Sequence, residues 1–400
     1  MTAATRVRIA GAGAVTGTPA MFPAAVETPN ALVVAYSTVP DGWPGGAVHV
    51  TRSLDGGRSW TGPAVAAAPH DGEDAVLGAV GLARRADGAL LLPVNAVTWT
   101  EGEGTAGRRL RLRLLRSADE GVTWTHDEPV DVDFAWPAVY GRIVEHRGDL
   151  LWPVWGKLRE GERWRSALLA STDGGDTWAV RGTIGYDPAA RLVGEYVDSG
   201  NSARGDDVEE IFDPEFRPHD PTDGFTETAV VELADGRLLA VLRQQGVGGD
   251  ATLAFFRAVS ADGGATWSAV ERIGFSGMSP DLLRFADGTL LLVSRRWAPE
   301  GSDVQPGVEA RIGSPDGLTW GDPCLLEDPH GTRLTSEYQC GYPAIVAEGD
   351  DAARVFFYSF LPEGGGRYVA WNLLRHDGEG PDATADHSDV SAGGTQSLHK

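Results

Sequence analysis

Ser53-Leu54-Asp55-Gly56-Gly57-Arg58-Ser59-Trp60 is a short segment with the pattern Ser-x-Asp-x-Gly-x-x-Trp, and the pattern recurs along the chain. Further copies run from 117 to 124, from 171 to 178 and from 260 to 267, and a shortened fifth copy runs from 314 to 320. In such a segment Asp accepts hydrogen bonds from the turn backbone, Gly permits positive φ, and Trp packs the turn onto its sheet. Each copy is therefore predicted to be a β-hairpin turn in which Asp and Trp are structural.

A second sequence pattern precedes most of these Ser-x-Asp-x-Gly-x-x-Trp segments, which we call Asp boxes. It consists of two apolar stretches joined by an Asp-Gly turn. It occurs around Asp87-Gly88, Asp235-Gly236 and Asp287-Gly288, and it predicts two buried strands. Together with the strands that flank the box, these make a four-stranded blade. Because the repeat recurs at roughly fifty residues, we expect an all-β fold, a six-bladed β-propeller with Asp-box hairpins.

The propeller is expected to fill residues 1–376, with a strand near Val7 closing the last blade. The long step between the third and fourth boxes holds an acidic segment rich in Gly and Pro, which predicts an insertion loop at about 185–224. Residues 377–400 are rich in Gly, Asp and Ser, and we expect a flexible C-terminal tail there.

The formal net charge of −23 argues against a nucleic-acid partner, which requires a basic surface. Cys324 and Cys340 are too few for a disulfide framework and lack the spacing of a zinc site. No segment is apolar enough to span a membrane, and the N-terminus does not read as a signal peptide. We therefore expect a cytoplasmic protein, or a secreted one if an export segment has been removed. The sequence does not indicate the oligomeric state.

Five Asp boxes in a six-blade frame resemble the sialidase (neuraminidase) superfamily, and the resemblance covers nearly the whole chain. It implies an exo-acting, retaining glycoside hydrolase whose nucleophile is a tyrosine activated by a glutamate. A neutral phenol suits a substrate with a carboxylate beside the anomeric carbon, because it is repelled less than Asp or Glu. Three arginines hold that carboxylate in the family. No cofactor and no metal are implied, and the expected partner is a glycan or glycoside.

Individual positions carry the resemblance further. Glu227, in Thr226-Glu227-Thr228, falls where the family places its activating glutamate, and Arg243 falls where it places its second arginine. The segment Gly341-Tyr342-Pro343 is similar to the one that bears the nucleophile, so the resemblance implies that role for Tyr342. Asp41, in a loop rich in Gly and Pro before the first box, is the candidate general acid.

The chain departs from the family at the other two arginines. Met21-Phe22-Pro23 stands where the first is expected, and 304–307 contains no Arg where the third is expected. Arg295 has the same register after its Asp-Gly turn as Arg243, so Arg295, or its neighbour Arg296, is the candidate replacement. An anionic, sialic-acid-like glycoside remains the expected substrate.

Two other classes of function stay open. The lost arginines are compatible with a carbohydrate- or protein-binding propeller that has no turnover, and a propeller lyase acting on uronic-acid polymers is a third possibility. Saturable binding without bond cleavage would favour the binding propeller, and an unsaturated product would identify the lyase.

Overall fold

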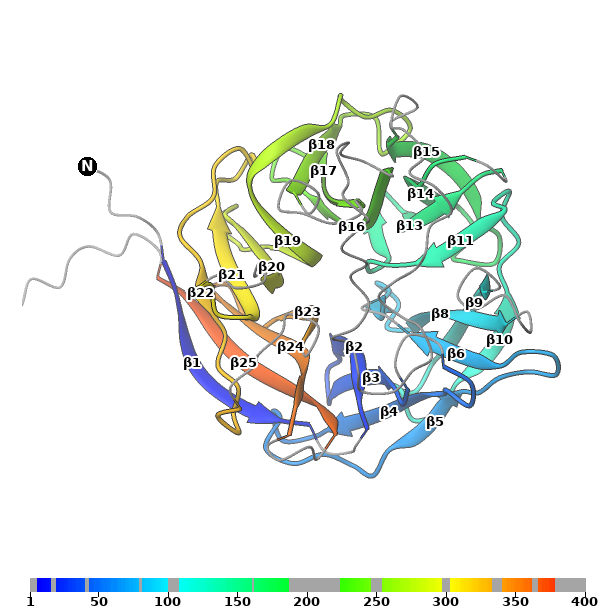
Figure 1. Ribbon diagram of the computed structural model, residues 1–400, viewed down its shortest axis with the longest axis horizontal. Helices are drawn as coiled ribbons and strands as arrows, with labels where there is room; N and C mark the ends of the chain where they lie inside the picture. The colour runs from blue at the N-terminus through cyan, green and yellow to red at the C-terminus, as the bar shows by residue number, and fades with distance from the viewer. Residues whose placement is uncertain are drawn as a thin grey trace, which may run out of the picture.

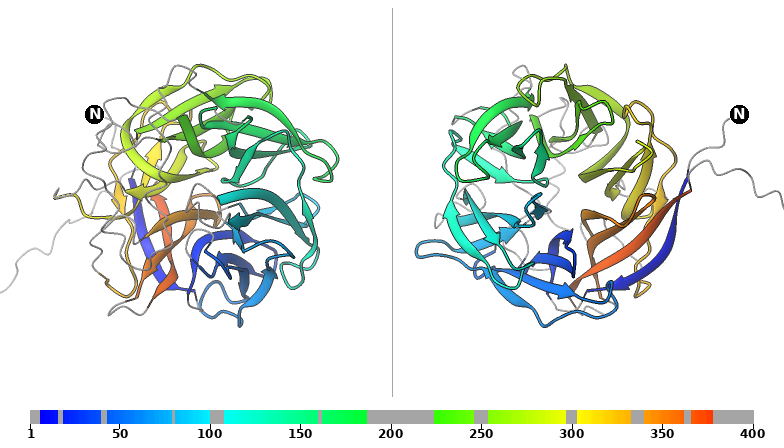
Figure 2. Two further views of the ribbon diagram at one scale, coloured as in Figure 1. Left: turned by 45° about the vertical axis from the view of Figure 1, so that its right-hand side comes forward. Right: turned by 180° about the vertical axis from the view of Figure 1, so that it is seen from behind.

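The computed structural model describes most of the chain, and the regular structure of that part is all β. The described residues are 6–15, 19–39, 43–78, 81–99, 108–159, 162–186, 224–245, 254–296, 303–332, 340–361 and 366–377. Their strands form five hydrogen-bonded sheets arranged in a ring around a central axis (Figure 1). The view from behind shows the same ring (Figure 2). The protein is therefore an all-β propeller, as the repeat predicts.

Three sheets are built by consecutive strands along the chain. The first contains β2 (Met21–Glu27), β3 (Leu32–Ser37), β4 (Val48–Ser53) and β5 (Ala64–Ala67). The second contains β6 (Ala75–Gly78), β7 (Ala83–Arg84), β8 (Leu90–Trp99), β9 (Arg108–Ser117) and β10 (Thr125–Pro129). The third contains β11 (Trp136–Val139), β12 (Val144–His146), β13 (Asp149–Lys157), β14 (Arg165–Ser171) and β15 (Ala179–Gly185).

The fourth sheet has seven strands because one long strand belongs to two hydrogen-bonded groups. Its strands are β16 (Gly224–Glu232), β17 (Leu238–Gln245), β18 (Ala254–Ser260), β19 (Glu271–Arg284), β20 (Leu290–Arg296), β21 (Gly307–Gly313) and β22 (Cys324–Leu325). The first half of β19 pairs with β18, and the second half pairs with β20.

The fifth sheet joins the two ends of the described chain. It consists of β1 (Arg6–Ala14), β23 (Gly341–Ala347), β24 (Ala352–Phe360) and β25 (Arg367–Asp377). The N-terminal β1 runs antiparallel beside β25, with Val7 opposite His376, and both views in Figure 2 show the two strands side by side. The predicted closing strand near Val7 is thus confirmed. This pairing fixes the ring without a covalent link, because the last sheet is completed by the first strand.

The Asp boxes form the predicted turns, each between the last two strands of a group. In the first copy, Asp55 Oδ1 accepts the N–H of Ser59 at 2.9 Å and the Ser53 hydroxyl at 2.8 Å. The N–H of Gly57 donates to Ser53 Oγ at 2.7 Å, so this backbone N–H also has a partner within the turn. The Ser59 hydroxyl, which donates to Asp55 Oδ2 at 2.6 Å, and the bonds from the Ser59 N–H and the Ser53 hydroxyl stabilise the ionised carboxylate and lower the pKa of Asp55 to about 2. The Asp side chain of the box thus bonds to its own turn and has a structural role.

Glycine is required at the box because the turn lies directly against the neighbouring sheet. Gly121 of the second copy has φ 81°, and a Cβ there would lie 2.8 Å from the Val33 side chain. The box tryptophan of the third copy, Trp178, packs edge-on against Trp152 of its own sheet with ring centroids 5.3 Å apart, and the same core cluster contains Leu91 and Leu112 of the second sheet. The second and third boxes therefore pack against a neighbouring sheet, and Trp178 belongs to the core between two sheets.

Several predictions concern parts of the chain that the structure does not describe. Most of the insertion at 185–224 and almost all of the tail at 377–400 lie outside the described residues. Within the described residues, no helix is long and apolar enough to cross a membrane.

Candidate active site

The strands nearest the axis bring the candidate site together through a shared irregularity. β2, β16 and β23 lie close to the axis in Figure 1, and each contains a register shift against its neighbouring strand. At these shifts Phe22, Glu227 and Tyr342 have positive φ of 51°, 37° and 49°, and Ser279 of β19 has φ 54° in the same setting. Positive φ in a residue other than Gly costs about 1–3 kcal/mol and concentrates at functional sites.

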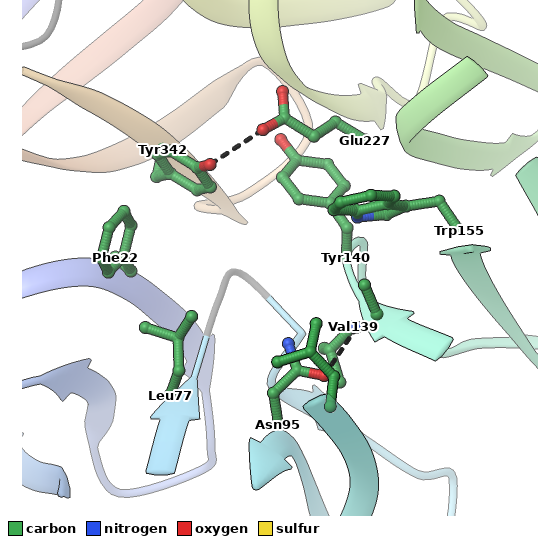
Figure 3. A pocket seen from close by; sticks show the side chains of 10 residues that line it. Phe22, Leu77, Asn95, Val139, Tyr140, Trp155, Glu227 and Tyr342 are labelled. Carbon is green, nitrogen blue, oxygen red and sulfur yellow. Dashed lines mark hydrogen bonds between the residues drawn. The ribbon is translucent and has the colours of Figure 1, made fainter. Parts of the chain in front are cut away.

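Glu227 is the centre of this cluster. Its side chain is buried, and Tyr342 donates its hydroxyl hydrogen to Glu227 Oε1 at 2.8 Å (Figure 3). The other carboxylate oxygen, Oε2, pairs with Arg243 Nη1 at 2.9 Å and accepts the N–H of Ser279 at 2.9 Å. The carboxylate is therefore held at both oxygens, and one of them faces the phenol that it would deprotonate.

Charges around Glu227 keep it ionised. Burial opposes its charge, but Arg243, Arg295 and the Tyr342 hydroxyl outweigh burial and lower the pKa of Glu227 below 4.5. Arg295 is itself buried, and the neighbouring Tyr358, Tyr342 and Glu227 offset that burial and raise its pKa. Among the described residues, the immediate surroundings of Tyr342 thus combine the Glu227 carboxylate with the two guanidinium groups of Arg243 and Arg295.

Tyr342 is held in place by rings on three sides. Phe22 packs edge-on against it with centroids 4.6 Å apart, Tyr140 lies edge-on at 6.1 Å, and Tyr358 is stacked at 6.4 Å. Arg295 places its guanidinium carbon 5.2 Å from the Tyr342 ring centroid and donates to the Tyr358 hydroxyl at 3.0 Å. A cation at this distance stabilises negative charge on the phenol, so Arg295 favours the phenolate that Glu227 would generate.

A three-residue segment of β19 ties the inner strands to one another. Beyond its Ser279 N–H contact with Glu227, the Pro280 carbonyl accepts the Tyr140 hydroxyl at 2.9 Å. Asp281 Oδ2 then accepts the N–H of Ile345 at 2.8 Å and pairs with Arg142. Ile345 follows Tyr342 on β23, so this segment fixes the two strands that carry Glu227 and Tyr342. Burial raises the pKa of Asp281, although Arg142 and the backbone N–H groups of Ile345 and Leu282 favour its charge.

A cavity opens beside the Tyr342–Glu227 pair, and most of its wall is apolar (Figure 3). The residues that line it are Phe22, Leu77, Asn95, Leu110, Ala138, Val139, Tyr140, Trp155, Glu227 and Tyr342. Glu227 is the one carboxylate among these residues. A cavity with a few polar groups in an apolar wall is typical of small-molecule sites, and a sugar ring has apolar C–H faces that pack on such a wall.

The structure brings four of the six predicted site residues together: Tyr342, Glu227, Arg243 and Arg295. Arg296 points elsewhere, because its Nε pairs with Glu309 Oε2 at 3.3 Å. Asp41 lies outside the described residues.

Where the first family arginine is expected, Met21 is buried in an apolar cluster with Phe22, Leu77 and Tyr358. Arg295 borders this cluster from another strand, through its contacts with Tyr358 and Tyr342.

Sequence reasoning did not find Asn95, Tyr140, Ser279, Asp281 and Tyr358. Asn95 had a usable signal, because it is the polar residue inside the apolar run from Leu90 to Val97 of β8. Ser279 and Asp281 flank a proline inside a long strand, which indicates a bulge. The contacts of Tyr140 with Pro280 and of Tyr358 with Arg295 join residues far apart in the sequence and have no local signal. Among the described residues, no group of three or more His, Cys, Asp or Glu side chains is arranged to hold a metal ion.

Comparisons with known proteins extend this description. No curated protein sequence matches the chain. Its structure resembles a protein of unknown function from Dyadobacter fermentans, with a TM-score of 0.71, 21% identity and coverage of 92% of this chain and 99% of that one.

It also resembles a Hadza microbial sialidase (TM-score 0.60, 18% identity, 89% of this chain and 65% of that one) and the Trypanosoma rangeli sialidase in complex with the inhibitor DANA (TM-score 0.60, 13% identity, 89% and 54%). The chain spans less than two thirds of the length of these two sialidases, and identities this low show a common fold. At the level of sequence, residues 48–355 match the BNR repeat-like domain, and the chain therefore belongs to that family.

Proposed function

We propose that the protein is an exo-acting, retaining glycoside hydrolase of the sialidase type. The observation that carries this proposal is the 2.8 Å hydrogen bond from the Tyr342 hydroxyl to Glu227, beside a cavity that both residues line. A half-buried phenol bonded to an ionised carboxylate is a nucleophile with its base already in place. The likeness of the fold to solved sialidases supports the same class of reaction.

In the first step, Tyr342 Oη attacks the anomeric carbon as its proton passes to Glu227 Oε1. The bond to the leaving group breaks, and an acid protonates the departing oxygen; Asp41 is proposed for this role on its position in the sequence. In the second step, Asp41 takes a proton from water, the water oxygen attacks the anomeric carbon, and Tyr342 leaves with its proton restored by Glu227. Two displacements at one carbon retain its configuration.

The charge of the site favours an anionic substrate. Arg243 and Arg295 outnumber Glu227, and a guanidinium group binds a carboxylate through two parallel hydrogen bonds. The Arg243 side chain is 17% exposed, whereas the Arg295 side chain is buried under Tyr342 and Tyr358. Arg243 is therefore the proposed contact for a substrate anion, and Arg295 is proposed to act on the Tyr342 phenolate.

The proposal extends to the architecture. The two halves of β19 pair with different strands, so we infer that the seven-stranded sheet counts as two blades and that the ring has six. Each of the two groups then has four strands with an Asp box before its last strand, the same order as in the β2–β5 sheet.

A carbohydrate-binding propeller without turnover is the second candidate function. It is favoured by the apolar cluster around Met21 and Phe22, which stands where the family has an arginine.

The test is the hydrolysis of aryl glycosides, namely a 4-methylumbelliferyl sialoside, a uronide and neutral hexosides, with proton NMR of the first product anomer. Release of fluorophore with retained configuration is expected. Inverted configuration would contradict the Tyr342 mechanism, and binding of these sugars without any cleavage would favour the second candidate.

A further inference from the structure

Asn95 has a buried amide that is satisfied at one end. The side chain is 3% exposed and lines the cavity from β8. Its Oδ1 accepts the N–H of Val139, on the neighbouring inner strand β11, at 3.0 Å. Because a backbone N–H can only donate, this bond fixes which end of the amide is oxygen, and Nδ2 must turn away from Val139.

The other end of the amide faces the cavity. Figure 3 shows the Asn95 nitrogen directed into the cavity, on the side opposite Tyr342 and Glu227. No acceptor for Nδ2 occurs among the residues that the structure describes. Because Nδ2 opens to the cavity, a ligand that fills the cavity must offer it an acceptor or leave it unpaired at a cost of roughly 1–3 kcal/mol, which points to an acceptor on the ligand.

A second buried asparagine shows what a structural amide looks like in the same fold. Asn372 on β25 is fully buried, its Oδ1 accepts the N–H of Glu327 at 2.8 Å, and its Nδ2 donates to the Glu327 carbonyl at 2.9 Å. Both ends of that amide are used within the protein. Asn95 differs in that only its oxygen is used.

The surroundings of Asn95 restrict the class of acceptor. Leu77, Leu110 and Val139 line the cavity beside it, and none of the cavity-lining residues is cationic. An anion placed there would be buried without a counter-charge, which is strongly unfavourable, whereas a hydroxyl oxygen would only exchange its bond to water for one to Nδ2. The sugar ring itself has C–H groups that pack against the apolar side chains.

We propose that Asn95 is a specificity-determining residue that donates its Nδ2 hydrogen to a neutral hydroxyl oxygen of the sugar, on the part of the ring remote from the bond that is cleaved. This inference rests on the proposed function, because it places the anomeric carbon at Tyr342. It assigns the two sides of the cavity different tasks: bond cleavage at Tyr342 and Glu227, and recognition of an uncharged hydroxyl at Asn95.

The test compares two substitutions of Asn95 with a matched control. Asn95→Asp keeps an oxygen for the Val139 N–H and removes the N–H donor, whereas Asn95→Leu, which cannot donate in any protonation state, removes both groups. Asn372→Leu removes a buried amide that is satisfied at both ends. Each is assayed on the 4-methylumbelliferyl glycoside that the wild type cleaves best and on its monodeoxy analogues. Both Asn95 variants are expected to raise KM for the parent about tenfold, with kcat changed much less. Asn372→Leu is expected to lower the unfolding temperature and leave KM unchanged.

The decisive result is coupling to one hydroxyl. For a single monodeoxy analogue, wild type and both Asn95 variants should have the same KM, because the interaction is already absent. Equal sensitivity of wild type and variants to every deoxy analogue would overturn the inference and leave the proposed function standing.

Titration with the free sugars (N-acetylneuraminic acid, glucuronic acid, galactose and glucose) separates the two proposals. Binding that is weakened by Asn95→Asp, in a protein that cleaves no glycoside, would support the inference and contradict the proposed function. Neither binding nor cleavage of any of these sugars would overturn both.

Discussion

The Asp-box turns and the inner-strand bulges are both repeated features. The boxes repeat the same residue types, whereas the bulges repeat a backbone geometry with different residue types. Each box has the same Ser and Asp, and these side chains bond to their own turn, as Ser260 and Asp262 do. The bulges repeat only their backbone: four positions with positive φ hold Phe22, Glu227, Ser279 and Tyr342. The Asp boxes, which repeat the same side chains, stabilise the ring. The bulges, which place different side chains on the same backbone geometry, assemble the candidate site.

The partners of these side chains differ as well. The Asp262 carboxylate accepts hydrogen bonds from residues no more than four positions away. Glu227 is bonded to Tyr342, Arg243 and Ser279, which come from three other strands. We therefore expect substitutions at the boxes to change stability and substitutions at the bulges to change chemistry, and four predictions test this separation.

The largest effect is expected at Tyr342. Tyr342→Phe removes the hydroxyl and keeps the ring that packs against Phe22, so kcat should fall by about 10³-fold or more while the unfolding temperature changes little. The matched control is Tyr358→Phe, which removes a hydroxyl bonded to Arg295 in the same aromatic cluster and should cost far less. Equal losses in both variants would mean that Tyr342 has no special role.

The second prediction concerns Arg243 and pH. In the wild type the lowered pKa of Glu227 keeps the carboxylate ionised below pH 4.5, so the acid limb of kcat/KM that reports Glu227 should lie below 4.5. Arg243→Met removes the main charge that opposes the effect of burial, so the pKa of Glu227 should rise and this limb should move above 4.5. The ratio of activity at pH 5 to activity at pH 7 should then be lower in the variant than in the wild type, in proportion to the protonated fraction of Glu227.

The Glu227–Arg243 ion pair also predicts how the free energy of unfolding changes with pH. Because the folded pKa of Glu227 is depressed, its ion pair contributes stability above the unfolded pKa, and that contribution is lost as pH falls through the folded pKa. Arg243→Met should remove this contribution, so the variant should lose less stability than the wild type between pH 7 and pH 4. A parallel loss in both proteins, measured by urea unfolding, would contradict the assignment.

The third prediction weakens the segment that joins the inner strands. Asp281→Asn removes the charge that pairs with Arg142 while keeping the shape of the side chain, and it should lower the unfolding free energy by about 2 kcal/mol. Since Asp281 also anchors Ile345, kcat should fall by a smaller factor than in Tyr342→Phe. The control is Asp176→Asn at an exposed ion pair with Arg116, where neither quantity should change measurably.

The smallest effect on activity is expected at the boxes. Asp262→Ala removes the acceptor of the Thr266 N–H and hydroxyl, so the unfolding temperature should fall while kcat/KM stays unchanged. The pKa of Asp262 is lowered to about 2, so its contribution is present at neutral pH and is lost only as pH falls through about 2. A large loss of activity without a loss of stability would contradict the proposed separation of roles.

The sequence predicted the boxes because a box is local. Its hydrogen bonds join residues within a few positions, so residue types at fixed spacing determine the turn, and the all-β propeller follows from the repeat. The closing strand near Val7 was also predicted and is confirmed by its pairing with β25. The number of blades was inferred from spacing and stays a proposal.

The site was predicted in part, and only where a family pattern marked single positions. Glu227, Arg243 and Tyr342 resembled the sialidase pattern, and the structure places them in direct contact. Ser279, Tyr140 and Asn95 act through contacts between strands that are distant in sequence, as in the bond from Val139 to Asn95. Such contacts depend on how neighbouring sheets are placed around the ring, and no spacing along the chain encodes that placement.

The central claim is that Tyr342 forms a bond to the sugar, and trapping that bond is its most direct test. The wild type would be incubated with an activated fluorinated analogue of the glycoside that it cleaves best, and its peptides would then be analysed by mass spectrometry. The account predicts one sugar attached to the peptide that contains Tyr342, with no adduct in Tyr342→Phe. A sugar attached to Glu227 or another carboxylate, or turnover in Tyr342→Phe at the wild-type rate, would contradict it.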